Sequence, residues 1–592
     1  MHASRNMVLT LLLAAACGDP TKREPLDGGA LPASASQVAF DSTMPPYVLA
    51  QPTPFVRIDL HMDEQGVVTR QALSRSDLTI QPLPPMTMEY LLVAYAGQRV
   101  VTSVPVVFDR SAHASRLDAN GSLLHDELPL TDAVATAYVP ATQEFDRLAL
   151  TARDGSMPLE VAPGDLTVLA TPPRPNVANS GPAVSQLRQG LSKTDLARLY
   201  PHIAFLEPGD EWAISELVRH EVTREIVADL ITPSAEMYDE IGDALAHCAP
   251  ALLSAGRSIA VVRWRAGAKP TQTESLGLTR GGIIALNAAK LTGTHETQET
   301  LTHELAHVFM NLVDDSASGM AGIVWSPEQR SAAAELVQRF DLARGFSKSW
   351  TELHESGIAG GFTTGYVGDG WDVQTDAAAS AGGFASPYGM RKAAEDIAEY
   401  VAKIGGNLVL RPTVCPASQG LQRLTVKAAI PYAKLVLLRA LGAIDQWSFD
   451  DCAGAVAIDG PSGINFEGGG KFTSDVHAGR RSGQGPEAIG VFGTGPSEYK
   501  ILIQLIQRGA DVSPLGLYRL SSIDLGSVSM DGLSGIYLSH PDIDRARGSR
   551  AGYVLITEAS VENVKGVVLG LSLQNGGGLI TDRWPLGTIS VP

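Results

Sequence analysis

Five consecutive residues, His303-Glu304-Leu305-Ala306-His307, could bind and use a metal ion. On an α-helix, residues four apart lie one turn apart on the same face, so the two imidazoles can bind one ion. Glu304 follows the first histidine and is placed to polarise a metal-bound water. The motif therefore predicts zinc-dependent hydrolysis, with His303 and His307 as ligands and Glu304 as general base.

The residues around the motif predict an amphipathic helix. Apolar side chains recur at three- and four-residue steps, at Leu301, Leu305, Val308, Phe309 and Leu312, and no Pro or Gly interrupts the segment through Asp315. Such a stripe packs into a core, as a catalytic zinc helix must. The alternative without chemistry is a half-buried helix with two hydrogen-bonded histidines.

A catalytic zinc ion usually has a third protein ligand. The metzincin pattern is excluded, because Met310 and Val313 stand where it requires Gly and His. Four downstream glutamates remain: Glu352, Glu355, Glu395 and Glu399. Glu395 is favoured because the apolar spacing around it predicts a second amphipathic helix. Glu399, one turn later, could accept a hydrogen bond from a zinc-bound histidine. By spacing alone, Glu395 and Glu399 fit a solvated acidic face equally well.

Two further features could serve hydrolysis of a carbonyl compound. Tyr388 precedes the second helix, and its phenol could donate a hydrogen bond to the oxyanion that forms on the substrate. The segment Gly281–Asn287, upstream of the first helix, predicts a short β-strand. The edge of such a strand can hold an extended peptide through backbone hydrogen bonds; the alternative is a plain core strand.

The second helix and the residues before it carry a family resemblance. The stretches Gly383-Phe-Ala-Ser-Pro-Tyr-Gly389, Glu395-Asp-Ile-Ala-Glu399 and Tyr366–Trp371 resemble the zinc-binding metallopeptidases of bacterial lipoproteins. The seven-residue step from Tyr388 to Glu395 is similar to the catalytic domain of anthrax lethal factor, a gluzincin. Gly389 departs from the Ala that is usual in the family.

The resemblance covers roughly residues 255–445 and implies a full set of roles. It implies His303, His307 and Glu395 as zinc ligands, Glu304 as general base and Tyr388 as oxyanion donor. It also implies a peptide or protein substrate.

The N-terminus predicts export. Arg5, the short apolar run Val8–Ala16 and the lipobox-like Leu13-Ala-Ala-Ala-Cys17 are typical of a lipoprotein signal peptide. We therefore expect the mature chain to be anchored to a membrane by acyl chains on Cys17. Gly18, with no Asp directly after Cys17, favours the outer membrane by resemblance to enterobacterial lipoproteins. No later run of the sequence reaches the roughly 18 apolar residues of a membrane-spanning helix.

The net charge argues against one class of binding partner, and the cysteine content suggests a disulfide. The net charge of −18 argues against nucleic acid, which needs a basic surface. After Cys17, three cysteines remain, and an exported chain permits a disulfide. Cys415 and Cys452 bracket a predicted helix and are the preferred pair, and Cys248 in an apolar run is expected to be a buried thiol.

The sequence predicts a multidomain protein, with an α+β zincin-like metallopeptidase domain flanked by two all-β sandwich-like domains. The expected segments are a signal peptide at 1–17, a flexible tether at 18–45, an Ig-like β-sandwich at 46–174, the metallopeptidase domain at 175–448 and a C-terminal β-sandwich at 449–592. Helices are expected at 183–199, 211–231, 235–253, 331–343 and 424–441, besides the two at the metal site.

The predicted function is that of an exported, lipid-anchored zinc metallopeptidase. Two alternatives stay open at this stage. One is a cell-surface protein that binds glycan or protein and keeps a vestigial zinc domain. The other is a zinc amidase that acts on cell-wall peptide. The presence of Glu304 favours an enzyme, because a purely structural zinc site has no need of it.

Overall fold

A computed structural model describes the chain over most of residues 48–591. The described residues are 48–80, 82, 89–117, 123–152, 154–162, 165–166, 190–219, 227–264, 277–280, 282–289, 291, 294–313, 346–359, 364–406, 414–415, 426–453, 462–467, 470–481, 487–507, 516–523, 525, 533–559 and 564–591. The predicted signal peptide, its Cys17, the tether at 18–45 and the helix at 331–343 lie outside these residues. Within them, none of the helices combines the length and the apolar character needed to cross a bilayer.

The chain is multidomain, with several β-sheets and about ten helices. Residues 35–457 form one compact unit, and residues 458–592 belong to another. The end of the first unit at residue 457 lies close to the predicted start of a C-terminal domain at 449. The boundary expected at 174 falls inside the first unit, so the predicted β-sandwich and metallopeptidase domains are not separate compact units.

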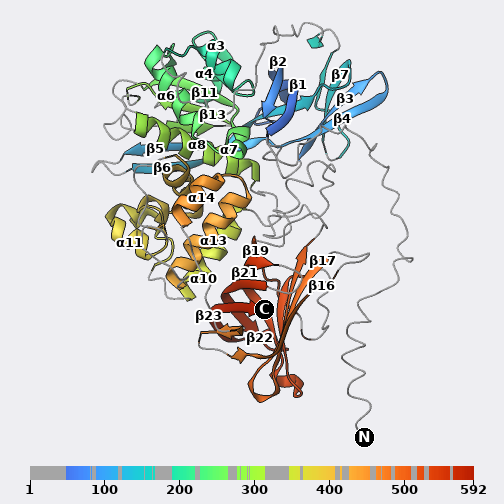
Figure 1. The fold of residues 1–592 in the computed structure, drawn as a ribbon. Helices are drawn as coiled ribbons and strands as arrows, with labels where there is room; N and C mark the ends of the chain where they lie inside the picture. Colours follow the sequence, from blue (N-terminus) through green and yellow to red (C-terminus); the bar gives the residue numbers. More distant parts are fainter. Residues whose placement is uncertain are drawn as a thin grey trace. The chain divides into compact units, whose positions relative to one another are not determined.

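A nine-stranded sheet runs through the first unit (Figure 1). Its order is β10-β11-β13-β12-β5-β6-β1-β2, with β9 paired to β11. The bounds are β1 Val48–Met62, β2 Val68–Ile80, β5 Asp109–Leu117, β6 Leu123–Pro140, β9 Ala204–Leu206, β10 Val227–Leu230, β11 Ser258–Trp264, β12 Gly277–Arg280 and β13 Ile283–Asn287. Strand β13 is parallel to β11, and β12 is antiparallel to both of its neighbours.

The N-terminal strands do fold as two facing sheets. A four-stranded sheet has the order β4-β3-β7-β8, with β3 Tyr90–Ala96, β4 Arg99–Val106, β7 Arg147–Ala152 and β8 Leu159–Val161. Side chains from β1 and β6, such as Ile58 and Val139, share one buried core with Leu92 and Leu150 of the smaller sheet. Val56, Ile58 and Leu60 of β1 are alternate residues, and they line this core because alternate residues of a strand face the same side.

Strand β5 covers the strands that precede the helix with His303 and His307, so these strands do not form the expected open edge. The expected strand at Gly281–Asn287 exists as β13, but it is internal, between β11 and β12. The outer side of β12 is also covered, because Leu278, Thr279 and Arg280 pair with Ala114, His113 and Ala112 of β5. In Figure 1 the blue strands β5 and β6 lie beside the green strands for this reason. The sheet therefore offers no open edge at β12.

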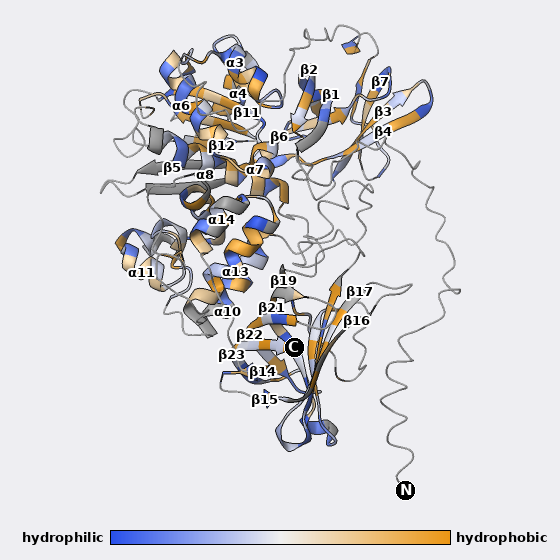
Figure 2. Ribbon diagram, viewed as in Figure 1, coloured by the Kyte–Doolittle hydropathy of each residue, from blue (hydrophilic) through white to orange (hydrophobic). Residues whose placement is uncertain are grey.

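Helices cover this sheet and build the rest of the unit. They are α3 Lys193–Leu199, α4 Glu211–Arg219, α6 Ala235–Ala246, α7 Pro250–Ala255, α8 Thr294–Val313, α10 Phe346–Ala359, α11 Asp376–Ala381, α12 Ala393–Tyr400, α13 Val426–Ala440 and α14 Gln446–Ala453. Hydrophobic and hydrophilic residues alternate along α6 and α13 in Figure 2, as expected of amphipathic helices.

Two of the predicted helices are shorter in the structure than the sequence indicated. The segment 211–231 ends as a helix at Arg219, and its last residues form β10. The segment 235–253 is broken into α6 and α7, because Pro250 lacks an N–H and starts a new helix at its first position. The predicted Cys415–Cys452 disulfide is present, and Cys248 is a buried thiol.

The second unit is a ten-stranded sheet with the order β15-β14-β23-β22-β21-β20-β18-β17-β16, and β19 paired to β21. Its strands are β14 Gly463–Phe466, β15 Lys471–Phe472, β16 Ser474–Arg481, β17 Glu487–Thr494, β18 Lys500–Gln507, β19 Gly516–Arg519, β20 Gly535–Ser539, β21 Arg547–Ala559, β22 Val564–Gln574 and β23 Ile580–Val591. Strand β16 at one end contacts β14 and β23 near the other. The sheet thus nearly closes into a barrel around one apolar core, rather than forming the expected sandwich.

Candidate metal centre

Helix α8 presents both histidines of the motif from one face. Its apolar stripe, which includes Leu301, Leu305 and Phe309, is fully buried. The helix packs against α6, α7, β12 and α12. His303 and His307 lie one turn apart and their Nε2 atoms are separated by 3.0 Å. The predicted helix is confirmed, and its burial fixes where the two imidazoles point.

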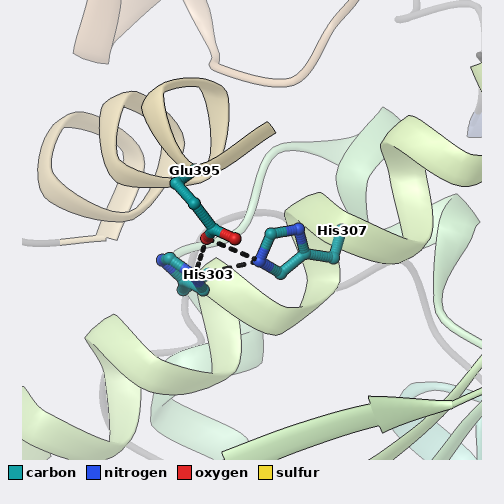
Figure 3. Close-up of side chains that lie close together, drawn as sticks. All are labelled: His303, His307 and Glu395. Atoms are coloured by element: carbon teal, nitrogen blue, oxygen red, sulfur yellow. Dashed lines mark hydrogen bonds and ion pairs between the residues drawn. The ribbon is translucent and has the colours of Figure 1, made fainter. Parts of the chain in front are cut away.

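Glu395 comes from the first turn of α12, which packs against α8. The carboxylate is fully buried. Its Oε2 atom lies 3.4 Å from His303 Nε2 and 3.2 Å from His307 Nε2. Figure 3 shows the three side chains converging from the two helices. The solvated acidic face considered for this helix is therefore wrong for Glu395.

The three ligand atoms have the spacing of a zinc site. Zinc bonds of about 2.0–2.2 Å in tetrahedral geometry separate neighbouring ligand atoms by about 3.3–3.6 Å. The three observed separations are 3.0, 3.2 and 3.4 Å. Two imidazoles and one carboxylate are also a donor set that zinc accepts in catalytic sites. The residues present therefore fit a zinc ion, and they leave the fourth tetrahedral position to another ligand.

Glu399 orients the first histidine. Its Oε1 atom lies 3.1 Å from His303 Nδ1, as the position one turn after Glu395 predicted. This contact keeps the Nδ1 proton in place and leaves the Nε2 lone pair directed at the centre. Burial raises the pKa of Glu399, but the hydrogen bond with His303 and the charge of Lys403 outweigh burial and lower the pKa to about 2.

The electrostatics of the centre favour a positive charge. Burial lowers the pKa of His303, yet hydrogen bonds and charges from Glu395 and Glu399 outweigh it and raise the pKa to about 10. The pKa of His307 is instead lowered, chiefly by burial. Two carboxylates thus share two imidazoles, of which one readily takes a proton. A divalent cation satisfies the same electrostatic demand more completely, because it attracts all three ligand atoms at once.

Glu304 is buried between α8 and the sheet. Its Oε2 atom accepts a hydrogen bond of 2.5 Å from the hydroxyl of Thr279 on β12. Strand β12 approaches so closely that a Cβ on Gly277 would lie 3.2 Å from Glu304 Oε1. The same Cβ would lie 2.9 Å from Thr300 Cγ2, so a side chain at this position would require Thr300 or Glu304 to shift. The hydrogen bond from Thr279 orients the carboxylate of the predicted general base.

Tyr388 lies beside the centre in a short 3-10 turn, Tyr388–Met390. Its ring centroid is 6.0 Å from that of His303, and Trp371 packs edge-on against it at 5.0 Å. Burial, followed by the charge of Glu395, raises the pKa of the phenol well above its usual value. The hydroxyl therefore keeps its proton at neutral pH and can donate a hydrogen bond.

The remaining candidates do not join the group. Glu352 and Glu355 lie on α10, and neither is among the residues that converge with the histidines. His354, also on α10, is fully buried and contacts Phe384 and Lys434. The pKa of His354 is lowered to about 2, by burial and then by the charge of Lys434. His354 is therefore neutral at any ordinary pH.

A second buried group of potential metal ligands was not predicted from the sequence. His61 of β1, Asp132 of β6 and Glu216 of α4 bring three potential ligand atoms within 4.8 Å of one another. The fully buried Arg280 of β12 lies among them, 3.0 Å from Asp132 and 3.8 Å from Glu216. No spacing in the sequence could have indicated this group, because its members come from four distant segments. Among the described residues, these two groups alone have a composition that could hold a metal ion.

Comparisons of the chain with protein-family models, with curated proteins and with solved structures find no match.

Proposed function

We propose that the chain is a zinc-dependent peptidase whose site comprises His303, His307, Glu395, Glu304 and Tyr388. The observation that carries the proposal is the convergence of three ligand atoms at zinc-like spacing from two helices. Glu304 is a residue that a structural zinc site does not need, and its carboxylate accepts a hydrogen bond from Thr279.

Each residue has a definite task in the proposed reaction. A zinc ion bound there supplies Lewis-acid chemistry, which lowers the pKa of water and polarises a carbonyl group. Glu304 takes the proton from the attacking water and later passes it to the leaving amine. Tyr388 donates a hydrogen bond to the oxyanion on the substrate carbonyl. Glu399 keeps His303 in the correct tautomer.

The sheet constrains how a substrate could bind. An extended peptide often adds to an open strand edge through backbone hydrogen bonds. That mode is blocked at β12, because β5 already pairs with its outer side. We therefore place substrate recognition on side chains around the metal centre rather than on strand addition to β12.

The cellular part of the proposal rests on the sequence alone. We propose export and lipid attachment at Cys17, from the lipobox-like Leu13–Cys17. A Cys17→Ala variant should lose incorporation of labelled fatty acid and leave the membrane fraction. Unchanged lipid labelling in that variant would refute the anchor without bearing on the metal centre.

The activity is tested with the full chain and a peptide library. The zinc-loaded protein should cleave peptides, 1,10-phenanthroline should stop cleavage, and added zinc should restore it. Cleavage that persists in chelator would contradict a metal mechanism. A zinc-saturated chain that cleaves no peptide but hydrolyses cell-wall fragments would replace peptidase with amidase.

A further inference from the structure

A buried ion pair lies directly beside the proposed glutamate ligand. Asp396 follows Glu395 on α12, and its Oδ2 atom lies 2.6 Å from the ammonium of Lys434 on α13. Both side chains are completely buried. Two opposite charges without solvent are stable only while they remain in contact, since a buried charge without its partner is strongly destabilising.

Asp396 is held by more than the lysine. The Trp350 indole on α10 donates a hydrogen bond of 2.7 Å to Oδ2, and the Tyr366 hydroxyl donates one of 3.2 Å to the same atom. Three donors from separate segments thus converge on one carboxylate oxygen. A carboxylate with several fixed donors is restricted in position as well as in charge.

Lys434 extends the network toward the segment that carries Tyr388. Its ammonium donates a hydrogen bond of 3.1 Å to the carbonyl oxygen of Gly383 and one of 3.2 Å to Nδ1 of His354. It also lies 4.9–5.2 Å from the ring centroids of three aromatic side chains, Trp350, Phe384 and Tyr400. The charge is therefore surrounded by groups that stabilise a cation and define its position.

The start of α12 depends on this network. Lys392 at the N-cap position makes no capping hydrogen bond with its side chain, so the first turn lacks the usual local anchor. Gly389 packs on the pair as well, because a Cβ there would lie 3.2 Å from Asp396 Oδ1. The turn that contains Tyr388 and the turn that contains Glu395 thus meet at the Asp396 carboxylate.

We infer that Asp396 and Lys434 are positioning residues that hold Glu395, and with it Tyr388, against the two histidines. The inference rests on the proposed zinc site and extends it to residues that touch neither metal nor substrate.

The test compares zinc binding by the full-length wild type and Asp396→Asn, using a chelating dye as competitor. The amide keeps the side-chain shape but removes the charge that pairs with Lys434. We expect zinc affinity to fall by about 10- to 100-fold, the usual effect of losing a residue that orients a ligand. The visible absorption spectrum of the Co²⁺-substituted variant should also change, because the ligand geometry changes.

A matched control separates positioning from general loss of stability. Asp59→Asn removes another buried carboxylate of the same unit, which pairs with Arg57 at 2.9 Å and is not part of the metal centre. This control should lose stability yet keep the zinc affinity and Co²⁺ spectrum of the wild type. If Asp396→Asn does not fold, Tyr366→Phe removes one donor to Asp396 and should weaken zinc binding several-fold.

The outcomes distinguish the two claims. A wild type that binds no zinc refutes the proposed function itself. A wild type that binds zinc, with Asp396→Asn or its substitute Tyr366→Phe unchanged in affinity and Co²⁺ spectrum, refutes the positioning role alone.

Discussion

The first unit contains two buried clusters of histidine and carboxylate that differ in composition and in the cation beside them. In the first, His303, His307 and Glu395 direct their ligand atoms at a common point, with separations of 3.0–3.4 Å. Lys392 Nζ lies 3.7 Å from the other carboxylate oxygen of Glu395. In the second cluster, a fully buried guanidinium, that of Arg280, lies 3.0 Å from Asp132.

The difference shows that residue types alone do not identify a metal site. Buried carboxylates need a positive partner, because an uncompensated charge in the interior is costly. Arg280 supplies that partner permanently in the second cluster and ties β12 to β6. The ligand atoms of the first cluster lie 3.0–3.4 Å apart. Both clusters could hold a metal ion by composition, and we propose zinc for the first and an ion-pair network for the second.

The largest contrast is expected from removal of one histidine in each cluster. His303→Ala should reduce bound zinc from about one ion per chain to nearly none, since two ligands rarely retain zinc. His61→Ala should leave the zinc content unchanged. Metal analysis of the two purified variants gives the answer, and full zinc content in His303→Ala would contradict the ligand assignment.

Removal of the proposed general base, Glu304, should separate catalysis from metal binding. Glu304→Gln should keep zinc but lower kcat by about 10²- to 10⁴-fold, because the general base is lost. Glu216→Gln, the matched change in the second cluster, should leave kcat of the folded protein near that of the wild type. Normal turnover by Glu304→Gln would refute the mechanism.

Arg280 tests the second cluster by its stability. Arg280→Met leaves Asp132 and Glu216 buried without their cation, and we expect the free energy of unfolding to fall by about 3–5 kcal/mol. Denaturant unfolding of the full chain, followed through the transition of the 35–457 unit, measures the loss. Added zinc should not restore stability; if it did, the cluster would be a second metal site.

Tyr388→Phe is expected to give the smallest effect. Loss of one oxyanion donor lowers kcat by about 10²- to 10³-fold. The zinc content of this variant should equal that of the wild type, because the proposed ligands are His303, His307 and Glu395 and do not include the phenol. Steady-state kinetics with a cleaved peptide measure the change, and an unaltered kcat would exclude Tyr388 as a donor.

Local patterns predicted the features that depend on neighbouring residues. The metal helix follows from the apolar spacing around His303 and His307, and Glu395 was favoured because its segment has the same periodicity. A few consecutive residues determine each of these helices. The Cys415–Cys452 pair, also present in the structure, was predicted from the cysteines that remain after Cys17 and from the helix they bracket.

Long-range pairings could not be predicted in this way. The antiparallel contact between β5 and β12 joins segments from both sides of the expected boundary at 174, and strand pairing leaves no trace in either segment alone. The second cluster was missed for the same reason. The burial of Lys434 could have been predicted from the sequence. Lys434 interrupts an apolar helical stripe that includes Ile430, Leu437 and Leu438.

Anomalous X-ray scattering at the zinc absorption edge, from crystals of the zinc-loaded protein, would locate the ion itself. We expect one strong peak at about 2.0–2.2 Å from His303 Nε2, His307 Nε2 and a carboxylate oxygen of Glu395. A zinc-saturated crystal with no peak at that point, or with its peak among His61, Asp132 and Glu216, would contradict the account.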